Sequence, residues 1–494
     1  MRAEVPVPAE PMAFVNALAP GWDRWPAESG TPVGTPFLIS PSYEFDVELN
    51  AFFSSVEMTT SARNTQTGYA GDLAAFLTFL WCSRGRTGWR DATEDDHLAY
   101  LFWRRQDEQG PRVDPATWDR EVAAVNSFYR WQVRAGHVAA NPVPQRAPRL
   151  LPTHLGRRAS GLGAIPETPA TYSHGAAGER VEWLPPESYR RWRDTGMRGY
   201  TVDGLPDRRF RGRWAARNAT FCDLMVRTGM RLAEQAALTV FEVPLQRGLG
   251  GHRRFWLPTA IAKGGSARWV YVPVSVISDL AAYVEFDRAE VVEQARGEGR
   301  YRRMPRPLVV EDPAVPIVTR RADGAAARIK VEHLAPHERR ALLLDGPDGL
   351  EPASFWLSEF GTPVAVSSWK DLFREANERC RRRGLAVRAH AHLLRHTFAV
   401  MTLEQLQRGH IAALAGATAE QRGHYVRVFG DPLDWVRRRL GHRSVVTTQI
   451  YLHALAELEM DTRMALIPDV GEHPRSLPLS DLHAAHALSS DRPA

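Results

Sequence analysis

The sequence predicts a mainly α (α+β) protein with two folded domains, and three observations support this. The chain has 494 residues, more than a single hydrophobic core usually organises. Apolar residues recur at helical spacing in two regions, separated by a segment rich in proline, glycine and arginine. A β-rich stretch around Lys263-Gly264-Gly265 is a hairpin signal, so we expect a small β-sheet or hairpin within the second domain.

The domain boundaries follow from changes in periodicity. Tyr69, Leu73, Phe76, Leu77 and Leu80 form one apolar stripe of the first helical region. We expect about four short helices there, ending near breakers at Gly136 and Pro142. The predicted order is an irregular arm at 1–44, a compact helical domain at 45–142, a linker at 143–180, a mainly helical domain with one hairpin at 181–470, and a polar tail at 471–494 with a short helical candidate at Ser480–Leu488.

Composition excludes several classes of protein. No apolar run approaches the ~18–20 residues of a membrane span, and the first residues do not resemble a secretory signal, so we expect a cytoplasmic protein without a membrane partner. Cys82, Cys222 and Cys380 lie far apart, which argues against a disulfide framework or a zinc ribbon. A net charge of +6 permits a polyanionic partner without establishing one. Lysine occurs only at Lys263, Lys330 and Lys370, which limits the candidates for lysine chemistry.

Two segments of the second domain place cationic groups at breaks in regular structure. Gly229 ends one predicted helix and Arg231 opens the next, with Glu234 one turn later. Taken alone, Arg231 could simply pair with Glu234 on a solvated face. Lys263 lies at the predicted hairpin tip, where a lone lysine usually serves solubility.

Two later segments carry further polar groups. His392 and Arg395 stand three residues apart, which places them on one helix face where they suit an anion such as phosphate. Gly441 ends the next predicted helix and His442 follows it. Tyr451 comes about two turns into the helix after that, where a tyrosine alone is more often a packed core residue.

Together these groups suit attack on a phosphodiester without a metal ion or another cofactor. Guanidinium groups stabilise the charge that develops on the nonbridging oxygens. A tyrosine with a pKa near ~10 needs cationic surroundings or a base to act as a nucleophile. The leaving sugar oxygen needs a general acid, which lysine or histidine can supply. The candidate catalytic residues are Arg231, Lys263, His392, Arg395, His442 and Tyr451.

These segments, in this order, resemble the tyrosine recombinase (phage integrase) family. The motifs are Thr228-Gly-Met-Arg-Leu-Ala-Glu, Ala262-Lys-Gly-Gly followed by Arg268 and Val270-Tyr-Val-Pro, His392-Leu-Leu-Arg-His-Thr-Phe-Ala, and Leu440-Gly-His with Thr447-Thr-Gln-Ile-Tyr. The helical region 45–142 is similar to the core-binding (SAM-like) DNA-binding domain of that family, carrying Asn64-Thr65, Ser127-Phe-Tyr-Arg-Trp and Asn141-Pro142. The resemblance therefore implies a helical core-binding domain followed by a tyrosine recombinase catalytic domain.

The resemblance also implies a role for each residue and a partner. Arg231 and Arg395 would clamp the scissile phosphate, and Lys263 would protonate the leaving 5′ oxygen. His392 would assist proton transfer, whereas His396 and His453 match positions usually treated as supporting. In the same way His442 would hydrogen-bond a phosphate oxygen and Tyr451 would form a 3′-phosphotyrosyl link, so that rejoining needs neither ATP nor metal. The partner would be double-stranded DNA with specific recombination sites in the nucleoid, bound by a homotetramer or by a hetero-assembly with sister recombinases.

Two departures from the family pattern and two alternatives stay open. Residues 285–350 and 405–429 are longer than the usual connections, so we expect insertions there. Phage integration, transposition of a mobile element and chromosome resolution share this chemistry. A type IB topoisomerase-like enzyme would use the same residues to relax DNA without site preference. A protein on the same fold could also bind DNA without cutting it.

Overall fold

The computed structural model of the chain describes residues 2–4, 34–146, 168–173, 181–212, 214–246, 251–305, 307–322, 325–415, 418, 431–444, 447–452 and 454. The chain divides into two compact units, Met1–Glu179 (unit 1) and Arg180–Ala494 (unit 2). Helices dominate both units, and the sheets are small. The mainly α fold with a small β component is therefore confirmed. In the described part of the chain, no helix is both long and apolar enough to span a bilayer.

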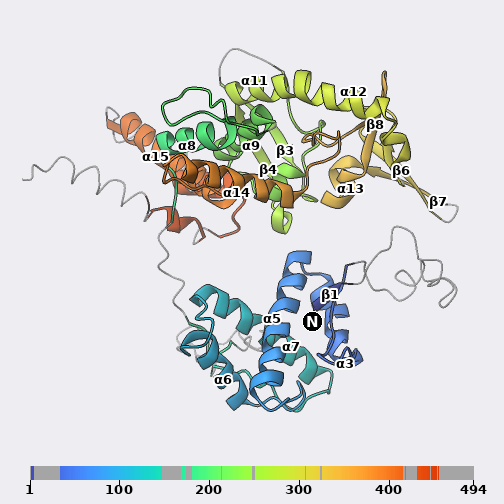
Figure 1. Cartoon of the computed structure of the whole chain (residues 1–494), viewed down its shortest axis with the longest axis vertical. Helices are drawn as coiled ribbons and strands as arrows, with labels where there is room; N and C mark the ends of the chain where they lie inside the picture. Colours follow the sequence, from blue (N-terminus) through green and yellow to red (C-terminus); the bar gives the residue numbers. More distant parts are fainter. Residues whose placement is uncertain are drawn as a thin grey trace, which may run out of the picture. The chain divides into compact units, whose positions relative to one another are not determined.

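Unit 1 is a helical bundle with a short strand pair. Its strands β1 (Arg2–Glu4) and β2 (Pro36–Leu38) pair antiparallel. Local signals position the longer helices, since Thr93 and Asp96 form a capping box at the start of α6, and Asp114 caps α7. Helices α5 and α7, of 21 and 20 residues, are longer than the short helices expected. The α-helices of unit 1 in the described residues are α3 (Val47–Ala51), α4 (Val56–Thr59), α5 (Arg63–Ser83), α6 (Glu94–Arg105) and α7 (Pro115–Arg134) (Figure 1).

Aromatic side chains dominate the core of unit 1. Phe76 meets both Tyr100 and Tyr129 edge to face, with ring centroids 5.1 and 6.2 Å apart. Described residues from the segment 143–180 also pack here, because Val143 is buried in this core and the carbonyl of Thr171 accepts a hydrogen bond from the Trp118 indole at 2.8 Å. These pieces of the predicted linker therefore cover the helical unit.

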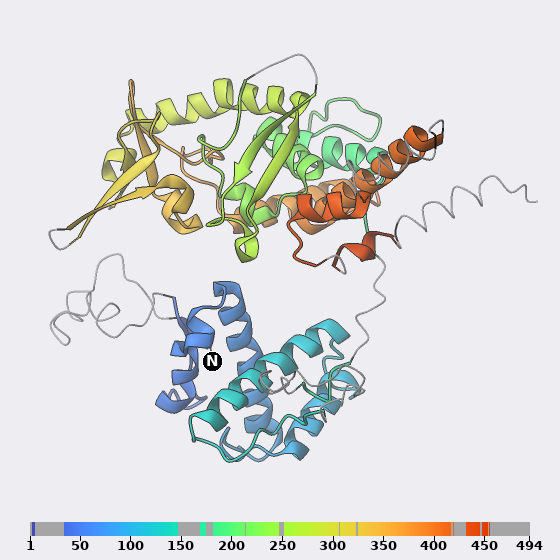
Figure 2. The ribbon, with the colours of Figure 1, turned by 180° about the vertical axis from the view of Figure 1, so that it is seen from behind.

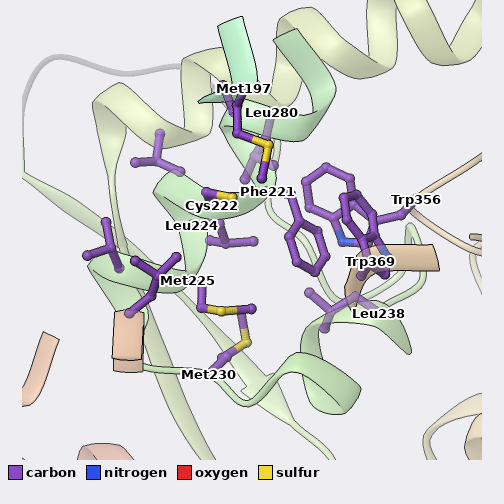
Figure 3. Packing of buried hydrophobic residues seen from close by; sticks show 14 of the residues in the cluster. Met197, Phe221, Cys222, Leu224, Met225, Met230, Leu238, Leu280, Trp356 and Trp369 are labelled. Atoms are coloured by element: carbon purple, nitrogen blue, oxygen red, sulfur yellow. The ribbon is translucent and has the colours of Figure 1, made fainter. Parts of the chain in front are cut away.

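Unit 2 is built around α9, which is buried along most of its length. Phe221 of α9 stacks on Trp369 with ring centroids 3.6 Å apart, and Trp356 meets both rings edge-on (Figure 3). This aromatic cluster lies in the main hydrophobic core of the unit, which also includes Met230 and Leu394 from the segments that carry candidate residues. Its described α-helices are α8 (Pro186–Trp192), α9 (Ala215–Thr228), α10 (Leu232–Ala236), α11 (Val274–Tyr283), α12 (Ala289–Gly297), α13 (Pro336–Arg340), α14 (Val366–Arg382), α15 (Ala391–Ala415), α17 (Pro432–Leu440) and a helical stretch at 447–452.

The hairpin predicted around Lys263 is confirmed. Strands β3 (His252–Leu257) and β4 (Arg268–Pro273) pair antiparallel, with Phe255 opposite Val270. Phe255, Leu257 and Val270 are buried on one face, whereas Trp256 and Trp269 are exposed on the other. The alternation fixes which face of the hairpin packs inward, because successive side chains of a strand point to opposite sides.

The segment 285–350 contains most of a folded sheet that sequence analysis did not resolve. Its strands are β5 (Leu308–Val310), β6 (Ile317–Ala322), β7 (Ala325–Lys330), β8 (Leu342–Gly346) and β9 (Gly349–Pro352). They pair in the order β7-β6-β5-β8-β9, with β5 and β8 parallel. Figure 2 shows this sheet at the opposite end of unit 2 from α15. Helix α15 extends into the other predicted insertion, 405–429, and most of that insertion, like Ser480–Leu488, lies outside the described residues.

Candidate active site

Gly229 turns the chain between α9 and α10 and so positions Arg231. Its φ of +64° is in the left-handed region, and a Cβ there would lie 2.3 Å from the Phe398 ring. Only glycine meets both conditions. Arg231 then caps α10, as the sequence predicted, and its side chain remains 23% exposed.

Glu234 is a buried acid that joins three of the segments. One of its oxygens accepts hydrogen bonds from the Arg231 side chain at 2.9 Å and from the backbone N–H of Lys263 at 3.2 Å. Its other oxygen accepts from Arg268 of β4 at 2.6 Å. Burial alone would raise the pKa of Glu234, but the hydrogen bond and charge of Arg268, assisted by Arg231, outweigh it and lower the pKa to about 2. Glu234 therefore stays ionised and fixes the first arginine against the hairpin.

Lys263 stands at the exposed end of the connection between β3 and β4. Gly264 and Gly265 follow it, both at positive φ, which allows the tight turn. The positive charge of Lys263 reaches His392 of α15: burial, then Arg395 and other neighbouring cations including Lys263, lower the pKa of that imidazole. The hairpin lysine thus shares one electrostatic environment with α15.

Arg395 is a buried cation held by backbone oxygens. It is 1% exposed, and its guanidinium donates to the carbonyls of Gly229 and Leu440, the latter at 2.6 Å. Within the described residues it forms no ion pair with a carboxylate. Burial, followed by the charge of Arg231, lowers the pKa of Arg395 to about 9. A buried cation without an acidic partner is suited to receive an anion from outside the chain.

His442 lies next to Arg395 in a fixed orientation. Gly441 ends α17 at a φ of +66°, as predicted, and His442 follows. One imidazole nitrogen lies 3.1 Å from Arg395 Nη2 and the other 3.0 Å from Thr448 Oγ1. Burial, then Arg395 and Arg231, lower the pKa of His442 to about 3, so the ring is neutral near pH 7.

Tyr451 completes the cluster from the helical stretch 447–452. It is 1% exposed, and its hydroxyl lies 2.9 Å from Nδ1 of His396. Its ring is nearly parallel to that of His442, at an angle of 12° and a centroid distance of 6.4 Å. Burial raises the pKa of Tyr451, and the charges of Arg395 and Arg231 oppose that effect. The phenol is therefore protonated at neutral pH and lies within reach of the charges of Arg395 and Arg231.

The structure brings the six predicted residues together through the hydrogen bonds of Glu234 and Arg395 and through the charges that shift the pKa values of the histidines and the tyrosine. The sequence did not indicate that Glu234 is the shared acid of the site or that Arg268 is buried against it. It also did not indicate the contact between His396 and Tyr451. Two local signals were available, because Glu234 occupies the capping-box position after Arg231 and His396 lies one turn after His392. Arg268, which is 6% exposed, belongs to the hairpin motif of the family resemblance, but no local pattern indicated its ion pair with Glu234.

The arrangement favours binding and activating a phosphodiester. Among the described residues of the site, the buried acid is Glu234, and it already forms ion pairs with Arg231 and Arg268. An added anion would therefore meet an excess of positive charge. A phenol next to these cations is a suitable nucleophile. Within the described residues no cluster of three or more His, Cys, Asp or Glu side chains is arranged to hold a metal ion.

Comparisons with known proteins identify relatives of both units. Residues 49–136 match the family described as "Phage integrase, N-terminal SAM-like domain". Over 389 residues the chain is 22% identical to tyrosine recombinase XerC of Lactobacillus delbrueckii subsp. bulgaricus, covering 79% of this chain and 88% of the relative. It is 34% identical over 101 residues to tyrosine recombinase XerC of Roseiflexus sp. (strain RS-1), covering 19% of this chain and 31% of the relative.

Solved structures also align with this chain at low similarity. One is the XerH site-specific recombinase bound to a palindromic difH substrate, in its post-cleavage complex. It shares 13% identity with a TM-score of 0.44, and the alignment covers 89% of this chain and 92% of that one.

Proposed function

We propose that the chain is a tyrosine recombinase, a site-specific DNA recombinase that cuts and rejoins DNA through a 3′-phosphotyrosyl intermediate. The observation that carries the proposal is the position of Arg395. It is buried without a carboxylate partner among the described residues, is held by the carbonyls of Gly229 and Leu440, and lies within electrostatic reach of Arg231 and Tyr451. A phosphodiester supplies the anion that this environment lacks.

Each candidate residue has a role that its surroundings support. Arg231 and Arg395 bind the nonbridging oxygens, and Tyr451 attacks the phosphorus. His442 is neutral, and because Thr448 and Arg395 orient it, it can hydrogen-bond a phosphate oxygen. Lys263 and His392, both exposed at the edge of the cluster, are accessible to the leaving 5′ oxygen. The chemistry conserves the phosphoester bond energy in the tyrosyl link, so rejoining needs no ATP.

The two units have separate tasks in this proposal. Unit 1 carries the core-binding domain, predicted from the sequence at 45–142, which binds duplex DNA, and unit 2 carries the catalytic domain, predicted at 181–470, which cuts it. Exchange between two sites needs four cleaving subunits, so we propose a homotetramer or a hetero-assembly with sister recombinases on DNA. The substrate places the protein on the nucleoid in the cytoplasm.

A covalent-capture experiment tests the activity and identifies the target sequence in one step. Full-length protein is mixed with a pool of randomised duplexes, each carrying a nick that lets a short 5′-hydroxyl fragment escape after cleavage. We expect a DNA adduct that survives denaturation with SDS, is enriched in one sequence, and is absent with Tyr451→Phe. Absence of any adduct from the wild-type protein, or an adduct that persists in Tyr451→Phe, would overturn the proposal.

Plasmid substrates carrying the captured sequence separate recombination from its alternatives. A recombinase should exchange strands only on plasmids with two copies of that sequence. Relaxation of supercoiled plasmid regardless of sequence would indicate a type IB topoisomerase-like enzyme. Salt-sensitive binding without an adduct would indicate a DNA-binding protein that does not cut.

A further inference from the structure

We propose that His396 is the general base that takes the proton from Tyr451 during cleavage and returns it during rejoining. The inference rests on the proposed function, and it adds to the six candidate residues a catalytic group that directly contacts the attacking oxygen. Its geometric basis is the 2.9 Å contact between His396 Nδ1 and the Tyr451 hydroxyl. Within the described residues, this is the hydrogen bond that the Tyr451 hydroxyl makes.

The surroundings of Tyr451 leave few routes for its proton. The ring packs among apolar side chains of α15 and α17, including Val400, Val436 and Leu440, and is 1% exposed. Water therefore has poor access to the hydroxyl in this arrangement. Burial also raises the pKa of the phenol, which disfavours spontaneous ionisation at neutral pH. A base in direct contact is the physical solution to both obstacles.

His396 is positioned to be that base because of its place on α15. It directly follows Arg395, which is anchored to Gly229 and Leu440, so the backbone at His396 is fixed relative to the proposed phosphate site. His392, one turn earlier, meets the His396 ring edge to face at 4.2 Å and limits its rotation. One helix thus directs Arg395 to the phosphate and His396 to the nucleophile.

The protonation state of His396 suits acceptance of a proton. Burial, then the neighbouring His392 and Arg395, lower the pKa of His396 to about 4, so the ring is neutral near pH 7 with one nitrogen lone pair available. A bound phosphodiester would offset the charge of Arg395 and so strengthen the base when the substrate is present. The same cationic surroundings make the protonated ring a good acid for the reverse step.

The step balances without an added reactant. The O–H bond of Tyr451 breaks as an N–H bond forms at Nδ1 of His396, and the phenolic oxygen forms a bond to phosphorus. The bond from phosphorus to the 5′ oxygen breaks, and that oxygen receives a proton from the general acid, for which Lys263 is the candidate. In rejoining, the 5′ hydroxyl gives its proton back to Lys263 as its oxygen forms a bond to phosphorus. The bond from phosphorus to the tyrosyl oxygen then breaks, and that oxygen recovers its proton from His396.

The test compares His396→Asn with Lys263→Ala on the captured suicide duplex. Asparagine keeps a hydrogen-bonding group near the phenol but is not a base. We expect the rate of adduct formation to fall on the order of 10²–10⁴-fold in His396→Asn, the usual range for loss of a general acid or base. The rate should then rise with pH across the range where the unassisted phenol ionises, whereas the wild-type rate should level off at lower pH.

A duplex with sulfur in place of the bridging 5′ oxygen distinguishes the two roles. The thiolate leaves without protonation, so this substrate should restore cleavage by Lys263→Ala but not by His396→Asn. Wild-type cleavage of the normal duplex, lost in Tyr451→Phe, shows that the enzyme works independently of this inference. The inference is overturned if the cleavage rate of His396→Asn is within about threefold of the wild-type rate or keeps the wild-type pH profile. It is also overturned if the sulfur-containing duplex restores cleavage by His396→Asn as it does by Lys263→Ala.

Discussion

Replacing Glu234 by glutamine should destabilise unit 2 and disable cleavage at the same time. Glu234 is 1% exposed and is bonded to Arg231, to the backbone of Lys263 and to Arg268. Its pKa falls from 4.5 to about 2, and at about 1.4 kcal/mol for each pKa unit this corresponds to about 3 kcal/mol of stability. Loss of the charge leaves Arg268 buried without its acid, which carries a cost of similar size, about 3–5 kcal/mol.

The sign of the pH dependence follows from the direction of that pKa. Because the carboxyl has a lower pKa in the folded protein, its contribution is fully present above pH 4.5 and is lost as the pH falls toward about 2. Urea unfolding followed by tryptophan fluorescence at pH 7 should therefore show an earlier midpoint in Glu234→Gln. In the variant, the free energy of unfolding should lose the part of its decrease between pH 4.5 and about 2 that comes from protonation of Glu234 in the wild-type protein.

Glu242→Gln is the matched control. Glu242 pairs with the buried Arg339 at 2.7 Å in the same unit, next to the five-stranded sheet and apart from the candidate site. Both variants should lose stability. At a temperature where both remain folded, only Glu234→Gln should lose adduct formation, on the order of 10²-fold, because Arg231 and the Lys263 turn lose their common anchor. An unchanged urea midpoint, or full cleavage by Glu234→Gln, would refute the reasoning.

Three further changes have defined outcomes. Arg395→Lys should bind DNA yet lose most adduct formation, since one ammonium cannot reproduce the planar fork that donates to the carbonyls of Gly229 and Leu440; equal adduct yields would contradict this. Gly229→Ala should lower stability by about 1–3 kcal/mol through its positive φ and the contact with Phe398, and an unaltered melting curve would count against that strain. Burial lowers the pKa of His97 from 6.5 to about 4, so stability should fall as the pH drops from 6.5 to 4, and His97→Gln should weaken that dependence in pH-resolved urea unfolding.

Local patterns in the sequence predicted where the helices of the site end and which candidate residues share a helix face. Gly229 and Gly441 mark helix ends because positive φ is a property of the individual residue. Helical spacing placed His392 and Arg395 on one helix, and paired glycines after Lys263 indicated the hairpin. The family resemblance then selected a recombinase from among the chemistries that such residues could serve.

The five-stranded sheet shows where local patterns were insufficient. Its strands are three to six residues long, and β5 pairs in parallel with β8 across more than thirty intervening positions. Short strands carry little periodic signal, and parallel strands are not joined by a short hairpin turn whose residues would indicate the pairing. The segment 285–350 was therefore recognised only as additional chain.

By itself the sequence determined which residue types were available for the chemistry and which local element carries each of them, because backbone preference and side-chain period act over a few residues. Only the tertiary structure decided that Arg395 is held by the carbonyl of Gly229, that Arg268 shares the acid of Arg231, and that Tyr451 faces His396. Those contacts join positions 34 to 166 residues apart. Their partners are selected by the packing of helices and hairpin around a common core, which no local period encodes.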